Sequence, residues 1–339
     1  MSRRGPEATP TRPVELRYNQ ALNLALRESL REDCRVIVLG EEVASPQGGA
    51  FAVTRGLVEE FGPERIINTP ISENGFVGVA VGAAMSGLRP VVELMFADFI
   101  ALAADQIINH AAKFRYVYGG QVTVPLVIRA ACGGYRGYGA THSQFPAAWF
   151  ANIPGIKIVA PLTPRSARQA LRWAVRDEDP VLFLEHKLLY GQKGEVPDYE
   201  GPDFEPRATV IREGEHLTII GFSYVLGMAL EASERLEADG ISAEVIDLCS
   251  LKPLDMETVL TSVRKTGRAV LVEEGPKTGG IGAEVLARIA EEAMPYLDGR
   301  LVRVAAADTP IPCAPELERA VLPDTDRIVE ACYSALSWD

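Results

Sequence analysis

Short apolar runs rich in β-branched residues alternate with amphipathic stretches along this chain, and this alternation constrains the fold more than any other feature. In the first half, apolar runs occur at 36–40, 90–94, 125–130, 157–161 and 181–185. Helical patterns accompany them at 19–31, 98–117 and 166–175. Buried parallel strands are typically continuous apolar runs of this kind. The pattern therefore predicts an α/β fold with a doubly wound parallel sheet.

The stretch 191–208 interrupts this alternation. It is rich in proline, glycine and acidic residues, which is typical of a linker. Beyond it the alternation resumes, with apolar runs at 217–222, 243–248, 269–274 and 301–306 and helical patterns at about 224–239, 255–265 and 281–296. We therefore expect two α/β domains, 18–190 and 209–339, joined by a linker at 191–208 and preceded by a flexible N-terminus at 1–17.

Composition excludes several classes of function. The net charge is −12, so the chain has no broad basic surface for nucleic acid or an anionic membrane. No apolar run reaches the length of a membrane span, and the first 17 residues lack the apolar core of a signal peptide. The 5 cysteines are scattered and form no C-x-x-C pair, which favours a reducing compartment. We expect a cytoplasmic protein with no nucleic-acid or membrane partner.

The common catalytic and nucleotide-binding motifs are absent. The chain has no phosphate-binding P-loop, no H-E-x-x-H zinc motif and no G-x-S-x-G elbow of serine hydrolases. The segment GGYRGYG (133–139) lacks the dinucleotide-binding spacing and does not follow the first predicted strand. We interpret it as a flexible loop over a cleft.

The 4 histidines differ in their sequence context. His110 lies in a helical pattern and is expected to be structural or at an interface. His186 directly follows a predicted strand, where a role at the domain junction is favoured, and His216 lies between two glutamates in a solvated turn. His142 follows the glycine-rich segment and precedes a helical one, a position typical of functional residues on a rigid scaffold. From the residues alone, a structural role for His142 stays open.

Carboxylates stand at two places in the chain where ligands commonly bind. Glu73 begins a helical pattern of glycine, alanine and valine, where tight packing would leave it in dry surroundings. Ser72 or Glu73 could cap that helix, or Glu73 could be a buried carboxyl that shares a proton with a ligand nitrogen. Glu41 and Glu42 end the apolar run 36–40, and the carboxyl ends of parallel strands line ligand crevices. A solvated turn is the alternative for this pair.

Seven segments, in this order, resemble one known family: LGEE (39–42), TPISENGFVG (69–78), GAAMSGLRPVVELMFADF (82–99), DQIINHAAKFRY (105–116), GATHSQ (139–144), PGIKIVAP (154–161) and RDEDPVLFLEHKLLYG (176–191). The chain resembles the beta subunit of the thiamine-diphosphate-dependent decarboxylase component of 2-oxo acid dehydrogenase complexes, of the pyruvate and acetoin dehydrogenase types. The resemblance runs from about residue 14 to the end. It implies a transketolase-like fold, with a pyrimidine-binding domain followed by a smaller C-terminal domain.

The resemblance also implies a cofactor and partners. In this family, thiamine diphosphate binds between an alpha and a beta subunit, and the alpha subunit holds Mg²⁺ and the diphosphate with a G-D-G…N motif. This chain has no G-D-G. We therefore expect an α2β2 heterotetramer, inactive without its alpha subunit, that works with a lipoyl acyltransferase component or a carrier protein.

Four residues match functional positions of the family. Glu73 matches the glutamate that hydrogen-bonds the aminopyrimidine ring nitrogen of thiamine diphosphate. Phe99 matches an aromatic side chain that packs against the pyrimidine, and Glu41 matches a second carboxylate involved in proton exchange between paired sites. His142 matches the catalytic histidine, which acts as an acid during acyl transfer to lipoamide.

A metal site is also implied by some members of the family. These relatives hold a structural potassium ion with main-chain oxygens at positions that match Leu126, Ala174, Val175, Asp177 and Asp179. The sequence RDEDP (176–180) is compatible with such a site.

Two departures from the family concern the substrate rather than the cofactor. Thr141 stands where a larger residue usually precedes the histidine, and Cys132 stands where many relatives have proline. Tyr135 and Tyr138 follow in the same loop. The 2-oxo acid, most simply pyruvate, is therefore left open, with acetoin cleavage or transfer of a two-carbon unit to a carrier protein as alternatives. Retention of Glu73 and His142 argues against a non-catalytic scaffold, and the chain is too short for a single-chain transketolase-like enzyme.

Overall fold

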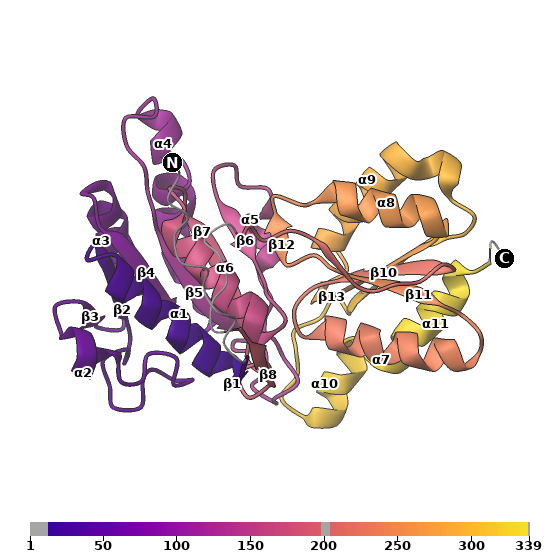
Figure 1. Cartoon of the computed structure of the whole chain (residues 1–339), viewed down its shortest axis with the longest axis horizontal. Coiled ribbons are helices and arrows are strands. Elements are labelled where there is room, and N and C mark those ends of the chain that lie inside the picture. Colours follow the sequence, from indigo (N-terminus) through magenta and orange to yellow (C-terminus); the bar gives the residue numbers. More distant parts are fainter. Residues whose placement is uncertain (1–12, 198–203, 338–339) are drawn as a thin grey trace, which may run out of the picture.

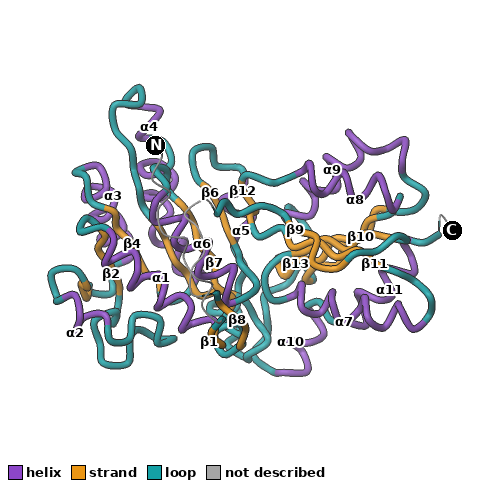
Figure 2. The backbone as a smooth tube through the Cα atoms, in the orientation of Figure 1, coloured by secondary structure: helices purple, strands orange, loops and turns teal. Residues whose placement is uncertain are grey.

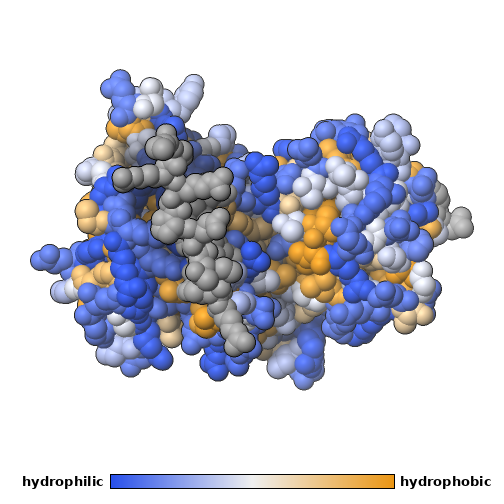
Figure 3. All heavy atoms as spheres, in the orientation of Figure 1, coloured by the Kyte–Doolittle hydropathy of each residue, from blue (hydrophilic) through white to orange (hydrophobic). Residues whose placement is uncertain are grey.

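A computed structural model describes residues 13–197 and 204–337. Two α/β domains lie side by side along the long axis of the molecule (Figure 1). Within the described residues, no helix has the length and apolar character needed to cross a membrane. The face drawn in Figure 3 is largely hydrophilic, with apolar patches between charged side chains.

The first domain is built on a seven-stranded sheet with the order β12-β6-β7-β5-β4-β2-β3. Its strands are β2 (Val36–Gly40), β3 (Ile66–Asn68), β4 (Arg89–Leu94), β5 (Val127–Cys132), β6 (Lys157–Val159), β7 (Val181–His186) and β12 (Ser250–Lys252). Neighbouring strands are parallel except for β12 and β6, which are antiparallel. The predicted doubly wound parallel sheet is confirmed.

Helices cover both faces of this sheet. On one face, α1 (Tyr18–Glu32) packs against α6 (Pro164–Arg176), which starts with a capping box at Thr163 and a proline at its first position. On the other face lie α3 (Glu73–Met85), the 3₁₀-helix η1 (Ala97–Ala103), the π-helix η2 (Gln106–Ala111) and α5 (Ala147–Ala151). The short helices α2 (Leu57–Phe61) and α4 (Phe114–Val117) complete the domain.

The predicted helix 98–117 is wrong as a single helix. The structure divides it into η1, η2 and α4. Ile100 and Ala103 are three residues apart, the repeat of a 3₁₀-helix, whereas Ile107 and Ala111 are four apart in the wider π-helix. All four side chains are buried, so the changes of helix type keep a continuous apolar face against α3.

The second domain has a five-stranded sheet with the order β14-β13-β10-β11-β9. Its strands are β9 (Thr209–Arg212), β10 (Leu217–Gly221), β11 (Ala243–Asp247), β13 (Ala269–Pro276) and β14 (Leu301–Ala306). The helices are α7 (Val225–Ala238) and α11 (Thr325–Ala335) on one face, and α8 (Met256–Thr266) and α9 (Ile281–Ala293) on the other, with η3 (Met294–Tyr296) and α10 (Pro315–Val321). The second predicted α/β unit is therefore present.

The predicted chain segments outside the two domains differ from the structure. β1 (Val14–Arg17) pairs antiparallel with β8 (Lys193–Val196), so the end of the expected flexible N-terminus and part of the expected linker form a two-stranded sheet. The pairing satisfies backbone groups that a loop would leave to water. Residues 204–208 of the expected linker form neither helix nor strand, and residues 1–12 and 198–203 of the two predictions lie outside the described residues.

β12 connects the domains more closely than a linker would. It follows β11 of the second sheet but pairs with β6 of the first, as the tube in Figure 2 shows. The backbone N–H of Ala160 donates to the Cys249 carbonyl at 2.8 Å, and the Lys252 ammonium donates to the Ala151 carbonyl at 2.7 Å. The two domains therefore share a sheet edge, which fixes their relative position.

Candidate active site

The carboxyl ends of the central parallel strands bring the predicted site residues to one edge of the first sheet. Glu41 directly follows β2, and Phe96 and Phe99 follow β4. The loop after β5 carries His142. This edge is where ligands bind in open α/β sheets.

The two candidate carboxylates are buried and close enough to interact. Glu41 is 8% exposed and Glu73, the first residue of α3, is 7% exposed. Burial, and then the negative charges of Glu73 and Glu42, raise the pKa of Glu41. Glu41 therefore binds a proton more readily than an exposed carboxylate does.

The same carboxylates have unused hydrogen-bonding capacity. The buried Oε1 atom of Glu41 has no hydrogen-bond partner among the described residues. Ser72 is the N-cap of α3 but makes no side-chain capping bond, so capping by Ser72 is not observed. Because buried oxygen atoms normally have partners, the unpaired atom indicates a place for a ligand donor.

His142 lies in an aromatic cluster. Its ring is edge-on to Phe96 and Phe99, with ring centres 4.7 and 5.2 Å away. Tyr138 extends the cluster, with its ring centre 6.2 Å from that of Phe96. The Thr141 hydroxyl is 3.0 Å from the Nδ1 atom of His142, so the residue that departs from the family pattern helps to orient the imidazole. His142 is half-buried and keeps access to the edge of the sheet.

The glycine-rich loop 133–139 is anchored, which corrects its interpretation as a flexible loop. The backbone N–H of Gly134 donates to Glu274 on β13 at 2.5 Å, and that of Gly137 donates to Glu318 on α10 at 2.9 Å. Both glutamates are almost fully buried. The C-terminal domain therefore holds the loop that leads to His142.

The other three histidines agree with their predicted roles. His186 is completely buried at the domain junction, where its Nε2 atom lies 2.7 Å from Glu274. His110 lies in η2 with its ring edge-on to Phe114, and the exposed His216 accepts a hydrogen bond from the backbone of Ser242. None of these three joins the cluster around His142.

Several residues near the site were not found from the sequence. Lys187 is buried behind His142, and its ammonium donates to the His142 carbonyl oxygen. Phe96 contacts both residues, with its ring centre 5.4 Å from the Lys187 ammonium and 4.7 Å from the centre of the His142 ring. A lysine directly after an apolar strand run was the only available signal for Lys187.

The five residues predicted to hold potassium lie around the C-terminal end of α6 and the turn that follows it. The carbonyl oxygen of Leu126 accepts from the backbone of Val181 at 2.9 Å, and that of Ala174 accepts from Asp177 at 3.3 Å. Asp179 follows in the same turn before β7, and its carboxylate contacts Arg115 at 2.6 Å.

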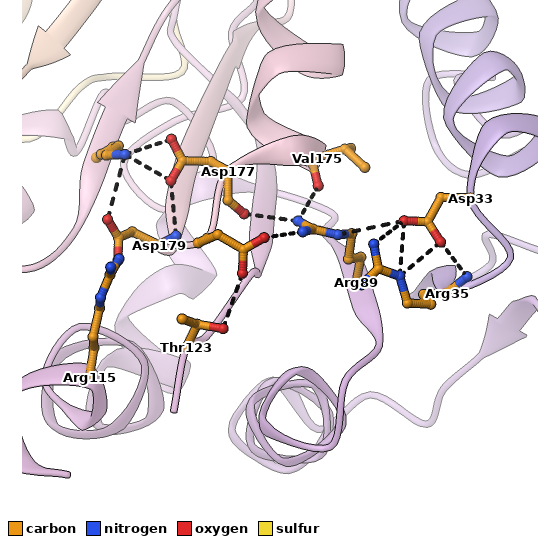
Figure 4. A network of polar contacts seen from close by, with 10 residues as sticks. Asp33, Arg35, Arg89, Arg115, Thr123, Val175, Asp177 and Asp179 are labelled. Carbon is orange, nitrogen blue, oxygen red and sulfur yellow. Dashed lines mark hydrogen bonds and ion pairs between the residues drawn. The ribbon is translucent and has the colours of Figure 1, made fainter. Parts of the chain in front are cut away.

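Cationic side chains already contact these oxygens (Figure 4). The carbonyl oxygens of Val175 and Asp177 both accept from Nη1 of Arg89, at 3.0 and 3.1 Å. The Asp177 carboxylate accepts two bonds from Lys157, at 2.7 and 2.6 Å. Potassium would have to share oxygens with these groups, and its presence stays a prediction. Within residues 13–197 and 204–337, no His, Cys, Asp and Glu side chains form a group that could hold a metal ion.

Comparison with known proteins gives the family. "Transketolase, pyrimidine binding domain" matches residues 14–193, and "Transketolase, C-terminal domain" matches residues 207–328. The Arabidopsis thaliana protein "Pyruvate dehydrogenase E1 component subunit beta-1, mitochondrial" is 48% identical, covering 94% of this chain and 90% of that protein. The chain belongs to the pyruvate dehydrogenase E1 beta-subunit family. The beta subunit of Rickettsia bellii is 44% identical, covering 94% of this chain and 99% of its own.

A solved structure agrees with this assignment. "Split gene transketolase, inactive beta4 tetramer" has a TM-score of 0.76 and 30% sequence identity, covering 94% of this chain and 98% of its own. The predicted family, the transketolase-like fold and the class of 2-oxo acid dehydrogenase beta subunits are confirmed. The roles of Glu41, Glu73, Phe99 and His142 stay predictions.

Proposed function

We propose that this E1 beta chain decarboxylates pyruvate, or a related 2-oxo acid, together with an alpha subunit and transfers the acyl group to lipoamide. The observation that carries this proposal is the buried pair Glu41 and Glu73 at the same sheet edge as His142 and Phe99. A family scaffold without activity would have no need to keep two interacting carboxylates away from water.

The residues fit thiamine diphosphate as the cofactor. Glu41 has a buried oxygen atom without a partner, and no hydrogen bond or ion pair involves the Glu73 carboxylate within the described residues. A ring with donor and acceptor nitrogen atoms can meet both needs, and Phe99 offers it an aromatic surface. When bound, the cofactor supplies the carbon nucleophile and the electron sink for decarboxylation.

Each side chain has a defined task in this proposal. Glu73 forms the hydrogen bond to the ring nitrogen, and exclusion of water strengthens that bond. Glu41 lies close to it and accepts a proton more readily than an exposed carboxylate, because burial and the neighbouring charges raise its pKa. His142 donates a proton during transfer of the acyl group, a contribution of about 10²–10⁴-fold.

An alpha subunit completes the site. The proposal assigns Mg²⁺ and the diphosphate to that subunit, in a heterotetramer of two alpha and two beta chains. Exposed apolar side chains on α3, just before it and on the η1 helix that packs against it support docking there: Ile71 is 84% exposed, Val79 67% and Leu102 58%. The proposal also includes a lipoyl acyltransferase as the acyl acceptor. Five free cysteines support a cytoplasmic location.

Two alternatives stay open because the loop before His142 departs from the family pattern. They are acetoin as the substrate and a carrier protein as the acceptor. In this loop, Thr141 contacts the His142 imidazole and Tyr138 packs on Phe96. A change of substrate or acceptor would act through these contacts, without any change at Glu41 and Glu73.

The test is turnover by the assembled complex. The chain is co-purified with its alpha subunit and assayed with pyruvate, branched-chain 2-oxo acids and acetoin, with a dye as electron acceptor. We expect turnover of pyruvate that requires thiamine diphosphate and both subunits. Lipoylated and carrier-protein acceptors then distinguish the two transfer reactions. Failure with all three substrates, with the cofactor bound, would contradict the proposal.

A further inference from the structure

Lys187 is a buried cation directly behind His142. It follows β7 and is 1% exposed, although lysine is almost never fully buried without a partner. Its ammonium donates a hydrogen bond to the backbone carbonyl oxygen of His142. The lysine therefore holds the peptide that carries the imidazole.

The same ammonium also contacts the aromatic cluster. It lies 5.4 Å from the ring centre of Phe96 and 5.2 Å from that of Tyr138. At these distances a cation is attracted to the face of an aromatic ring, and more strongly where water is excluded. Phe96 is edge-on to the His142 ring. Lys187 therefore fixes both the backbone of His142 and the Phe96 ring that packs against the imidazole.

Two acidic side chains near Lys187, those of Asp98 and Glu274, stabilise its positive charge. Burial lowers the pKa of Lys187, while the acidic groups Asp98 and Glu274 oppose this effect and the Arg136 guanidinium adds to it. Asp98 also accepts from the backbone N–H of Gln144 at 3.3 Å, two residues after His142. Lys187 and Asp98 thus hold the two ends of the same short segment.

We propose that Lys187 is a positioning residue for His142, which sets the imidazole for proton transfer without touching the cofactor. This inference rests on the proposed function of His142. It adds a residue that is 45 positions away from His142 in the sequence, so the sequence alone does not indicate its role. Loss of the ammonium should let the segment and the Phe96 ring relax, so the imidazole would leave its productive orientation.

The test uses the fact that the chain has only 4 histidines. With ¹³C-labelled histidine, the full-length chain gives few imidazole Cε1–H signals, and a His142→Gln variant assigns the one from His142. The test variant is Lys187→Met. The matched control is Lys252→Met, because the Lys252 ammonium also donates to backbone carbonyls, those of Ala151 and Ile153, but does not contact the rings of Phe96, Tyr138 and His142.

We expect Lys187→Met to move the His142 signal by more than its linewidth and Lys252→Met to leave it in place. In the alpha–beta complex, Lys187→Met should lower kcat by about tenfold or more and leave the dissociation constant for thiamine diphosphate unchanged. If Lys187→Met does not fold, Lys187→Gln is assessed by the same criterion.

An unmoved His142 signal in a folded Lys187 variant would overturn the inference. An inactive wild-type complex would instead count against the proposed function, since the spectra of the beta chain do not depend on turnover. Equal loss of kcat in the Lys187 and Lys252 variants would also overturn the inference, because it would indicate a general effect on the domain junction.

Discussion

The Nε2 atom of His186 lies 2.7 Å from the Oε2 atom of Glu274, and this contact joins the end of β7 to β13 of the other domain. The His186 ring also stacks on Tyr224, with ring centres 4.6 Å apart. The second oxygen atom of Glu274 accepts from the backbone of Gly134. One carboxylate of the C-terminal domain therefore fixes both the strand end before Lys187 and the glycine-rich loop.

Replacing this carboxylate should loosen the loop. In Glu274→Gln, a neutral amide replaces the buried charge that His186 and Gly134 contact, so we expect the free energy of unfolding to fall by about 1–3 kcal/mol. The exposed Arg136 lies in the released loop, and trypsin should cleave after it faster than in the wild type. Urea unfolding and timed proteolysis measure the two effects.

Glu316→Gln is the control for this prediction. Glu316 lies on α10 with its side chain 79% exposed, and its ion pair with Arg319 is at the surface. We expect no change in cleavage after Arg136 and less than about 0.5 kcal/mol in stability. Unchanged cleavage in Glu274→Gln would contradict the anchoring role of that carboxylate.

Strands whose own residues form an apolar run can be predicted from the sequence. Strands that form only because they pair with a distant segment are missed. β2 and β14 have the predicted bounds because each is a largely apolar run, interrupted in β14 only by Arg303. β1, β8 and β12 have three or four residues each and mixed polarity. Their strand conformation depends on distant segments with which they pair, and a local pattern does not contain that information.

The same distinction applies to the site. Glu41, Glu73 and His142 are distinct in their own sequence context, and the structure brings the two glutamates together. Lys187 has an ordinary local context, and its importance arises only because the fold sets it beneath His142. Residues that position a catalytic group from another segment of the chain are therefore the hardest part of a site to predict from the sequence.

The buried ion network of Arg129, Glu93 and Glu185, on three neighbouring strands, should make a large contribution to the free energy of unfolding. Arg129 is 1% exposed and bonds Glu185 at 2.7 and 2.8 Å and Glu93 at 2.6 Å. Burial raises the pKa of Glu93, and the Arg129 charge opposes that rise. Arg129→Met would leave two carboxylates buried without a cation, so we expect a loss of about 3–5 kcal/mol in urea unfolding at pH 7.

An exposed arginine provides the comparison for Arg129. Arg31 pairs with Glu60 at 2.7 Å, but its side chain is 60% exposed. Arg31→Met should cost less than about 1 kcal/mol, since water and salt screen the pair. Similar losses for the two variants would mean that burial of the Arg129 network does not determine its contribution.

Glu273 should make stability depend on pH. Burial raises the pKa of Glu273 to about 7, and the hydrogen bond from the Gly282 backbone opposes this only in part. The folded state thus keeps a proton that the unfolded carboxyl loses near pH 4.3, so this stabilisation is lost as pH rises toward 7. The free energy of unfolding of Glu273→Gln, relative to that of the wild type, should therefore rise by on the order of 2–3 kcal/mol between pH 5 and pH 8.

Urea unfolding at several pH values measures this difference. Glu291→Gln is the control because Glu291 is exposed on α9, the helix whose residue Gly282 donates to Glu273. Its stability relative to wild type should not change with pH. A Glu273→Gln difference that stays constant from pH 5 to pH 8 would show that the carboxyl is already ionised in the folded protein at pH 5.

Removal of the Glu73 carboxylate should abolish the reaction without unfolding the chain. Glu73 is the first residue of α3 and lies at the sheet edge, so Glu73→Ala removes a hydrogen-bonding group and leaves the apolar core intact. We expect turnover of the alpha–beta complex to fall by at least about 10²-fold, with weaker binding of thiamine diphosphate in calorimetric titration. Glu59→Gln, on the exposed face of α2, should match the wild type in both measurements. Full turnover in Glu73→Ala would favour a scaffold role for the chain and would leave the buried carboxylate pair without a catalytic purpose.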